Sequence, residues 1–418
     1  MEWVELFLGI GDKVKKCRTV YALKQASFSK FGISQHYLSM IETNKRQPPE
    51  KTLIDIYDAL VTLTEGEMRS LYTLDEFLKT PEEQAREFFE QRLTIDTIVD
   101  QYDELMSVAK QYNLTSYMIQ LDKLLGQYYF MRNDGQEAVK HFQIAIDRAI
   151  KEDINPYHLY QQFGIMLRKL GRYVESISKL SIAIGYAKTE EQIKEIDVLL
   201  ILTYYQMGQH QLALEMINQL TSKANIYPSK HYVKAILIKV EILRNNGLIL
   251  ESRDYLLALL DEPEYEPYLK HIYHSLGWNY IANHEYSKAL EILKKAFSYR
   301  ESDLEKALTL LLIGAVYFEM EEYEEAQSYY TQIKSTILSS WSTNSKKMWF
   351  DKQLDLYWRT KQMDKVVLLQ QELKELVETE ALPEDTVNQI KKTFLKQVST
   401  RTSLSEEEYS PLYNFLVF

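Results

Sequence analysis

A unit of 37–40 residues recurs seven times in this chain, and this repeat constrains the fold more than any other feature. A small residue marks the second predicted helix of each unit, at steps of 38, 37, 39, 37, 37 and 40 residues: Ala138, Ser176, Ala213, Ser252, Ala289, Ala326 and, degenerately, Val366. Self-similarity at such a period is typical of stacked helical pairs, each of which buries its apolar face against the next. The sequence therefore predicts an all-α solenoid after about residue 80.

Small and bulky residues stand at fixed offsets from each of these anchors. Glycine precedes the anchor by twelve residues in the best units: Gly126, Gly164, Gly277 and Gly314. A large residue follows it by four: Phe142, Leu180, Ile217, Leu256, Leu293 and Tyr330. We expect the small residues to let two antiparallel helices approach closely, and the large one to fill the gap to the next pair. This spacing resembles that of tetratricopeptide repeats over residues 114–375, and residues 82–113 are expected to add one further helical pair.

The first 66 residues follow a different pattern, that of a compact bundle of short helices. Apolar residues at helical spacing predict one face of a first helix: Ile10, Val14, Cys17 and Val20. A short second helix over 24–31 is expected to end at Gly32, because glycine readily adopts the left-handed conformation that closes helices. Ser34 is expected to cap a third helix over 35–42. Residues 52–60 are predicted to form a helix that covers the core.

A helix, a tight turn and a second helix that starts with polar residues form the geometry that enters the major groove of DNA. Two stretches, GIGDKVKKCR (residues 9–18) and SFSKFGISQHYLSMIETNKRQPPEKTLIDIYDAL (residues 27–60), together resemble the five-helix domain of lambda-repressor-type and Xre-type regulators. The matches are the glycine before the third helix, the serine at its cap, the Leu-Ser-x-Ile-Glu run, the Asn-Lys-Arg-x-Pro turn and the Thr-Leu start of the next helix. One departure is Phe28-Ser29-Lys30, where the family usually has Leu-Ala.

The resemblance implies which side chains of the head meet DNA. Base edges are expected to meet the start of the third helix: Ser34 at its cap, then Gln35, His36 and Ser39. Phosphates are expected to meet the side chains around it: Gln25, Asn44, Lys45 and Arg46. Glutamine can read adenine with two hydrogen bonds, and lysine or arginine supply salt-dependent affinity for the backbone. The alternatives are an ordinary surface histidine, a solvated basic turn, and a small helical domain that no longer binds DNA.

A solenoid of this kind has a concave groove lined by the first helix of each pair, where extended peptides bind through side-chain anchors and amides. Alignment on the anchors places large polar and aromatic residues on this wall: Lys123, Gln127, Gln161, Arg168, Tyr205, Glu241, Arg244, Asn245, His274 and Trp278, with Asn279 adjacent. Arginines two repeats apart suit a peptide carboxylate, and an asparagine can pair with an extended backbone. The alternative is a water-filled groove whose arginines balance the acidic surface.

Charge is distributed unevenly along the chain of 418 residues, whose net charge is −11. Residues 1–66 carry nine Lys or Arg and eight Asp or Glu, whereas the remainder carries 40 and 52, so the acidic charge belongs to the repeats. Any DNA binding is therefore expected to be confined to the head. The single cysteine, Cys17, excludes disulfides within one chain and fits a cytoplasmic address. No apolar run approaches the roughly 20 residues that a membrane span needs.

The sequence shows no pattern that indicates catalysis, a cofactor or a metal. It lacks a phosphate-binding glycine loop, a nucleophile elbow and a supported Cys/His pair. His271 and His274 are three residues apart on one predicted helix, without a nearby carboxylate or cysteine to complete a metal site. We therefore expect no enzyme, no cofactor and no metal.

Together these features predict an all-α chain: a five-helix lambda-repressor-like DNA-binding domain (1–66), a linker helix (67–81), a tetratricopeptide-repeat superhelical solenoid (82–400) and a C-terminal tail (401–418). This combination resembles the peptide-pheromone receptors of Gram-positive bacteria, the Rgg, Rap, NprR, PlcR and PrgX group, and most closely the NprR branch. The resemblance implies a cytoplasmic, homodimeric transcription regulator that binds operator DNA and a short signalling peptide. Two alternatives remain: a Rap-like scaffold acting on a response regulator, and a phage or plasmid repressor without a peptide ligand.

Overall fold

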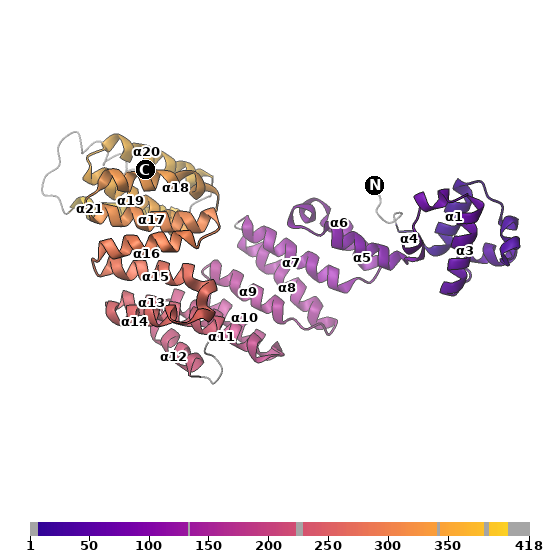
Figure 1. The fold of residues 1–418 in the computed structure, drawn as a ribbon, viewed down its shortest axis with the longest axis horizontal. Coiled ribbons are helices and arrows are strands. Elements are labelled where there is room, and N and C mark those ends of the chain that lie inside the picture. The colour runs from indigo at the N-terminus through magenta and orange to yellow at the C-terminus, as the bar shows by residue number, and fades with distance from the viewer. Residues whose placement is uncertain (1–6, 133, 223–228, 341–342, 380–383, 400–418) are drawn as a thin grey trace. The chain divides into compact units, whose positions relative to one another are not determined.

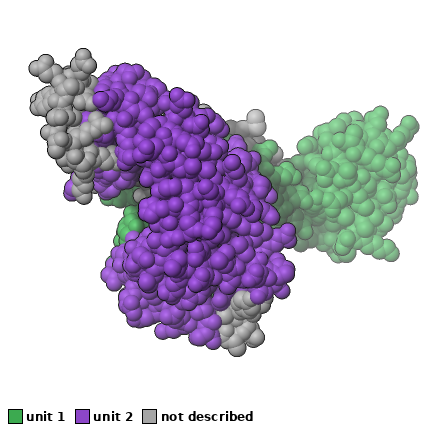
Figure 2. All heavy atoms as spheres, turned by 60° about the vertical axis from the view of Figure 1, so that its left-hand side comes forward, with its two compact units in different colours: residues 1–196 green, residues 197–418 purple. Residues whose placement is uncertain are grey.

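The computed structural model describes residues 7–132, 134–222, 229–340, 343–379 and 384–399 (Figure 1). The C-terminal tail expected at 401–418 lies outside the described residues. The described chain is all-helical and forms two compact units, residues 1–196 and residues 197–418 (Figure 2). None of its described helices is both long enough and apolar enough to cross a membrane.

The head begins the first unit with six short helical elements. They are α1 (Ile10–Val20), the 3-10 helix η2 (Gln25–Phe31), α2 (Gln35–Glu42), α3 (Glu50–Leu63), the 3-10 helix η3 (Glu67–Ser70) and α4 (Leu74–Leu78). The helices expected over 24–31, 35–42 and 52–60 are thus confirmed, although the first of them is a 3-10 helix. Apolar side chains from all six elements form one core, in which Phe28 and Leu38 are fully buried.

Local signals fix where α2 begins. Gly32 has φ +77° and ends η2 in the left-handed conformation, as the sequence predicted. The hydroxyl of Ser34 accepts a hydrogen bond of 3.2 Å from the backbone N–H of Tyr37, which satisfies one of the unpaired donors at the helix start. Leu38 and Ile41 then point into the core, so the opposite side of α2 is left outward.

Two expectations about the head were wrong. Val20, assigned to the apolar face of the first helix, is 59% exposed because it ends α1 beyond the core. Lys13 occupies a fully buried position instead, with its Nζ donating to the backbone carbonyls of Glu76, Phe77 and Lys79 at 2.5, 3.3 and 2.6 Å.

The segment expected to form one linker helix over 67–81 forms η3 and α4, whose Met68 and Phe77 lie in the core of the head.

Helical pairs follow the head in both units. Those that begin in the first unit are α5 (Pro81–Arg92), α6 (Ile95–Gln111), α7 (Thr115–Met131), α8 (Gly135–Lys151), α9 (Tyr157–Lys169), α10 (Tyr173–Tyr186) and α11 (Glu190–Gln206). The rest are α12 (His210–Thr221), α13 (Lys230–Asn245), α14 (Ile249–Leu260), the 3-10 helix η4 (Pro263–Tyr268), α15 (Leu269–Ala282), α16 (Tyr286–Ser298), α17 (Asp303–Glu319), α18 (Tyr323–Ser340), α19 (Thr343–Arg359), α20 (Met363–Glu378) and α21 (Glu384–Ser399).

The fold is that of a tetratricopeptide-like repeat array, as the spacing predicted. All seven anchor residues are buried, and in Figure 1 the helices α15, α16 and α17 lie side by side, each packed on the next. The two serine anchors add a bond, because Ser176 donates to the carbonyl of Gly164 at 2.7 Å and Ser252 donates to that of Val240 at 2.9 Å. Each of these bonds ties the second helix of a pair to the first.

The large residue of each unit packs differently from the expectation. A Cβ added to Gly277 would stand 2.4 Å from Leu293, and one added to Gly314 would stand 2.5 Å from Tyr330. The large side chain therefore fills the space over the glycine of its own pair first. Contact with the next pair occurs as well, since the ring of Phe142 in α8 stacks 5.5 Å from that of Phe163 in α9.

Candidate functional site

The outward side of α2 carries the residues expected to meet base edges. Gln35 and His36 are exposed in its first turn, beside the cap Ser34, and Ser39 is partly buried one turn later. The four lie on the start of one short helix, whose inner side is fixed by Leu38 and Ile41. This arrangement leaves amide, imidazole and hydroxyl groups free to face a nucleic-acid groove.

Basic residues follow α2 in an exposed turn. Asn44 adopts φ +55°, and Lys45 and Arg46 are exposed next to it. The guanidinium of Arg46 lies 5.2 Å from the centre of the Tyr37 ring, which places the charge beside the first turn of α2. The residues expected to meet phosphates at this turn therefore flank those expected to meet bases.

Gln25 lies at the end of α2, where a hydrogen bond holds its amide. Its Nε2 donates to the carboxylate of Glu42 at 2.8 Å, and the same carboxylate receives two bonds from Arg18, of 2.7 and 3.1 Å. Glu42 is only 6% exposed, so this pairing with Arg18 compensates a buried charge and fixes the end of α2 against α1. Sequence reasoning missed Arg18 and Glu42, although the Glu belongs to the matched motif.

In the first unit, the residues expected to line the groove differ from one another in burial. Lys123 and Gln127 on α7 are half-buried. Gln161 on α9 is only 8% exposed, with its Oε1 3.5 Å from Nδ1 of His158. Arg168 on α9 is partly buried, and burial lowers the pKa of its guanidinium.

In the second unit, the structure brings five of the expected residues into one cluster. The Tyr205 hydroxyl lies between the carboxylate of Glu241 and the amide of Asn245; burial, and then this carboxylate, raise the pKa of Tyr205. Glu241 also forms an ion pair of 3.8 Å with Arg244. The guanidinium of Arg244 lies 5.4 Å from the centre of the Trp278 ring. Three helices, α11, α13 and α15, thus supply one polar wall with a tryptophan beside it.

His274 stands one turn before Trp278 on α15, among cations. Burial, and then the charges of Arg300, His271 and Arg244, lower the pKa of His274 to about 3, so its imidazole is neutral at ordinary pH. Arg300, between α16 and α17, is 6% exposed, and sequence reasoning missed it because it lies outside the repeat helices.

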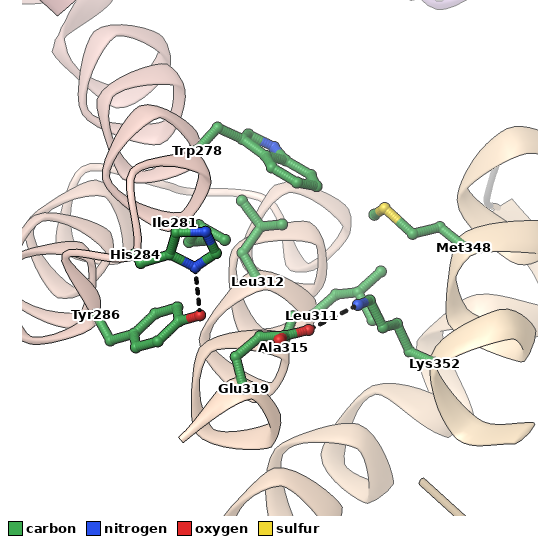
Figure 3. A pocket seen from close by; sticks show the side chains of 10 residues that line it. All are labelled: Trp278, Ile281, His284, Tyr286, Leu311, Leu312, Ala315, Glu319, Met348 and Lys352. Carbon is green, nitrogen blue, oxygen red and sulfur yellow. Dashed lines mark hydrogen bonds and ion pairs between the residues drawn. The ribbon is translucent and has the colours of Figure 1, made fainter. Parts of the chain in front are cut away.

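Trp278 also borders an apolar hollow of about 260 Å³ (Figure 3). The residues that line it come from α15, the turn after it, the start of α16, α17 and α19: Trp278, Ile281, His284, Tyr286, Leu311, Leu312, Ala315, Glu319, Met348 and Lys352. Its polar members are paired, with Nδ1 of His284 2.9 Å from the hydroxyl of Tyr286 and Lys352 3.9 Å from Glu319. Sequence reasoning did not identify this hollow, because its lining joins three successive repeats.

One expected groove residue is placed elsewhere. Asn279 is 1% exposed, and its Nδ2 donates to the carbonyl of Ser275 at 3.1 Å, within its own helix. It follows Trp278 by one residue, which turns it about 100° around the helix axis, away from the side that carries His274 and Trp278. Asn279 thus lies apart from the wall that carries His274 and Trp278, and its part in binding a ligand stays a prediction.

Metal-binding geometry is not found in the part of the chain that the structure describes. No group of three or more His, Cys, Asp or Glu is placed there so that it could hold a metal ion. His271 and His274 lie near the cationic Arg300, which lowers the pKa of both imidazoles after burial. A dication would face the same repulsion from this arginine.

Comparison with known proteins finds repeat proteins. The family model of the tetratricopeptide repeat matches residues 307–335, which are most of α17, most of α18 and the turn between them. No curated protein matches the sequence. Among solved structures, a tetratricopeptide repeat protein from Parabacteroides merdae is similar at 14% identity over 64% of this chain and 96% of its own, with a TM-score of 0.49.

Two further solved structures cover more of the chain. The apo form of the quorum sensor NprR from B. thuringiensis is similar at 12% identity over 93% of this chain and 97% of its own, with a TM-score of 0.45. The apo form of RapI is similar at 15% identity over 80% of this chain and 96% of its own, with a TM-score of 0.46. At these identities the comparisons concern the fold alone.

Proposed function

We propose that this chain is a transcription regulator that binds operator DNA through α2 of its head and responds to a short peptide bound by its repeats. The observation that carries the proposal is the outward side of α2, where exposed Gln35 and His36 are followed by exposed Lys45 and Arg46. Polar groups at the start of a helix, with cations in the next turn, suit base edges and phosphates respectively. A regulator of this kind acts in the cytoplasm.

The repeats supply the second half of the proposal. The wall of Tyr205, Glu241, Arg244 and Asn245 offers donors and acceptors to an extended backbone, and Trp278 offers an aromatic face. Peptide binding would favour one arrangement of the helical pairs over another, and a linked pair of heads would then change its spacing on DNA. The proposed ligand is therefore a short peptide rather than a metabolite.

Selection from random duplex DNA tests the first half. The full chain should enrich a specific sequence, and Gln35→Ala should relax preference at one base pair by about 1–3 kcal/mol. Arg46→Ala should weaken binding to every sequence and flatten the salt dependence by roughly one unit. Lys295→Ala is the matched control, because this exposed lysine of α16 is paired with Glu291, far along the chain from the head. Unchanged affinity in both head variants would show that α2 is not the DNA reader.

Peptides encoded by the reading frame next to the gene test the second half. Such a peptide should change the chain's affinity for the selected DNA, and Arg244→Ala/Asn245→Ala should abolish this response while circular dichroism shows unchanged helicity. Isothermal titration calorimetry measures the binding directly. A double variant that binds the peptide as well as the wild type does would place the ligand elsewhere.

A further inference from the structure

The chain after α21 contains an apolar run at residues 411–418. Six of these eight side chains are apolar or aromatic and none is charged: Leu412, Tyr413, Phe415, Leu416, Val417 and Phe418. Three glutamates precede the run, at 406–408. Apolar surface is unfavourable in water, and a run of this kind marks a segment that packs against another surface. Although the run lies outside the described residues, its composition therefore indicates that it binds an apolar surface.

The hollow beside Trp278 is an apolar surface in the same unit as this run. Leu311 and Leu312 at its floor are each 1% exposed, whereas Trp278 and Met348 at its sides are partly exposed, so the hollow opens to the surface. Figure 3 shows the side chains of Trp278 and Met348 pointing toward each other from α15 and α19. The volume of about 260 Å³ is below the roughly 300–1,000 Å³ of pockets for small molecules, which favours one or two side chains as the occupant.

The chain leaves α21 close enough to the hollow for the run to reach it. Helix α21 packs on α19, where the ring of Phe394 lies 5.8 Å from that of Trp358. From Met348 to Trp358 along α19, and from Phe394 to the end of α21 at Ser399, the path is about 23 Å at 1.5 Å per residue. The axes of packed helices add about 8–10 Å. The residues 400–410 span up to about 36–40 Å when extended, which is enough.

Charge and tethering also favour this occupant. Helix α19, which forms one side of the hollow, carries four Lys or Arg and two Asp, although the repeats as a whole are acidic. The glutamates at 406–408 therefore bring the opposite charge to this helix just before the apolar run. A segment joined to its site by a short stretch of chain acts at an effective concentration in the millimolar range, so a small contact suffices to hold it.

We propose that the run 411–418 docks in the hollow beside Trp278 of its own chain, with one or two of its large side chains packed on Leu311 and Leu312. The occupant is a segment of this protein, so the contact adds a form of regulation to the proposed function. A docked run covers Trp278, whose aromatic face the proposed peptide would use. An incoming peptide then has to displace the run, which acts as an internal competitor.

Cross-linking within the full chain tests this contact. Cys17, the single cysteine, is fully buried, so introduced thiols are the accessible ones. Met348→Cys is combined with Leu412→Cys or with Leu416→Cys, and a short bismaleimide is added. At least one of the two pairs should link tenfold faster than the same cysteine of the run combined with Lys295→Cys, an exposed control position on α16 outside the hollow. Rates equal to the control for both pairs would overturn the docking.

The mass of the product shows which chain supplies the run. The linked product should migrate as one chain of 49.4 kDa, and its rate of formation should not depend on protein concentration. A product of twice that mass would mean that the run of a second copy fills the hollow, which overturns docking within one chain. Should Met348→Cys fail to fold, Lys352→Cys decides, since this partly exposed lysine lies one turn further along α19 and also lines the hollow.

Peptide binding tests whether the run is a competitor, and this step rests on the proposed function. Leu412→Ser/Phe415→Ser/Leu416→Ser should release the run and raise the affinity for a cognate peptide at least tenfold in calorimetry. Unchanged affinity, beside a fast cross-link, would overturn the competition by showing that run and peptide use different surfaces. A chain that binds no peptide would overturn the peptide half of the proposed function, whereas the cross-link, measured without peptide or DNA, still decides the docking.

Discussion

Among the glycines of the head, Gly11 is the one at which an added Cβ would come closest to other atoms. A Cβ there would stand 2.2 Å from the carbonyl oxygen of Ile41 and 2.5 Å from Oδ1 of Asn44. A backbone oxygen cannot yield without moving α2, so we expect Gly11→Ala to cost about 1–3 kcal/mol of head stability or more. Hydrogen exchange followed by mass spectrometry should show faster exchange in peptides covering residues 35–42. Gly185→Ala in α10 is the control, since its Cβ would meet nothing within 4 Å.

Lys13 makes the stability of the head depend on pH. Burial, and then the charge of Lys79, lower the pKa of Lys13 to about 8 from an ordinary value of 10.5. Between these two values the unfolded chain binds more protons than the folded one, so this lysine's contribution to stability rises with pH from about 8 upward. Burial raises the pKa of Cys17 to about 11, which has the opposite effect above pH 9. Of these two groups, therefore, only Lys13 changes the stability of the head between pH 8 and pH 9.

Lysine-selective ¹³C NMR checks this prediction. One Cε resonance should titrate near pH 8 and should be missing in Lys13→Met. A spectrum in which every lysine titrates above pH 10 would contradict it. The burial of Lys13 could not be predicted from the sequence, because its carbonyl partners lie 63–66 residues away and a lysine on a helix is ordinarily exposed.

At the scale of elements, four helical pairs have a glycine opposite a large side chain: Gly126, Gly164, Gly277 and Gly314. Gly277→Ala would place a Cβ 2.4 Å from Leu293, whose side chain is fully buried and has little room to move. We expect the single variant to lower the stability of the second unit by about 1–3 kcal/mol through overpacking. Adding Leu293→Val should recover part of this loss, with a coupling of roughly 1 kcal/mol in a double-mutant cycle. Urea unfolding measures both, and strictly additive effects would contradict the proposed contact.

Most of the helical pairs could be predicted from the repeat spacing. Wherever two paired helices pack closely, small anchor residues and glycines recur at fixed distances in the sequence. The same periodicity could not predict the short elements. Residues 67–81 were expected to form one helix, yet the capping box at Thr73 and Glu76 starts a separate short helix there. A second capping box, at Thr80 and Glu83, starts α5. Local capping interactions set where these helices begin, and the spacing of apolar residues does not predict such interactions.

The residues of the candidate sites, too, could be predicted only in part from the repeat pattern. Arg244, His274 and Trp278 could be placed on one wall because the repeat anchors fix which side of each first helix faces the groove. Arg300 lies between two repeats, and the residues that line the hollow come from several helices. Neither stands at a fixed distance in sequence from the repeat anchors, so the repeat pattern could not predict them. Asn279 follows Trp278 directly in the sequence yet is only 1% exposed, and the repeat pattern could not predict this difference between neighbours.

For the whole molecule, the distribution of charge predicts that one chain alone binds DNA weakly. The head carries nine basic and eight acidic residues, and the remainder of the chain is net acidic. Few cations are thus available for phosphates, and affinity depends strongly on the number of phosphates neutralised. Regulatory affinity therefore requires two heads on two half-sites, which calls for a homodimer.

Light scattering and DNA spacing together test this prediction. The chain of 49.4 kDa should form a complex that contains two copies when it binds a duplex with two half-sites about 10 base pairs, or a multiple, apart. Inserting about 5 base pairs would rotate one half-site to the opposite face of the duplex, so affinity should fall steeply. Removing one half-site should lower affinity as much, because the second head then loses its phosphate contacts. A single chain bound tightly to one half-site, with no effect of the insertion, would rule the homodimer out as the DNA-binding form.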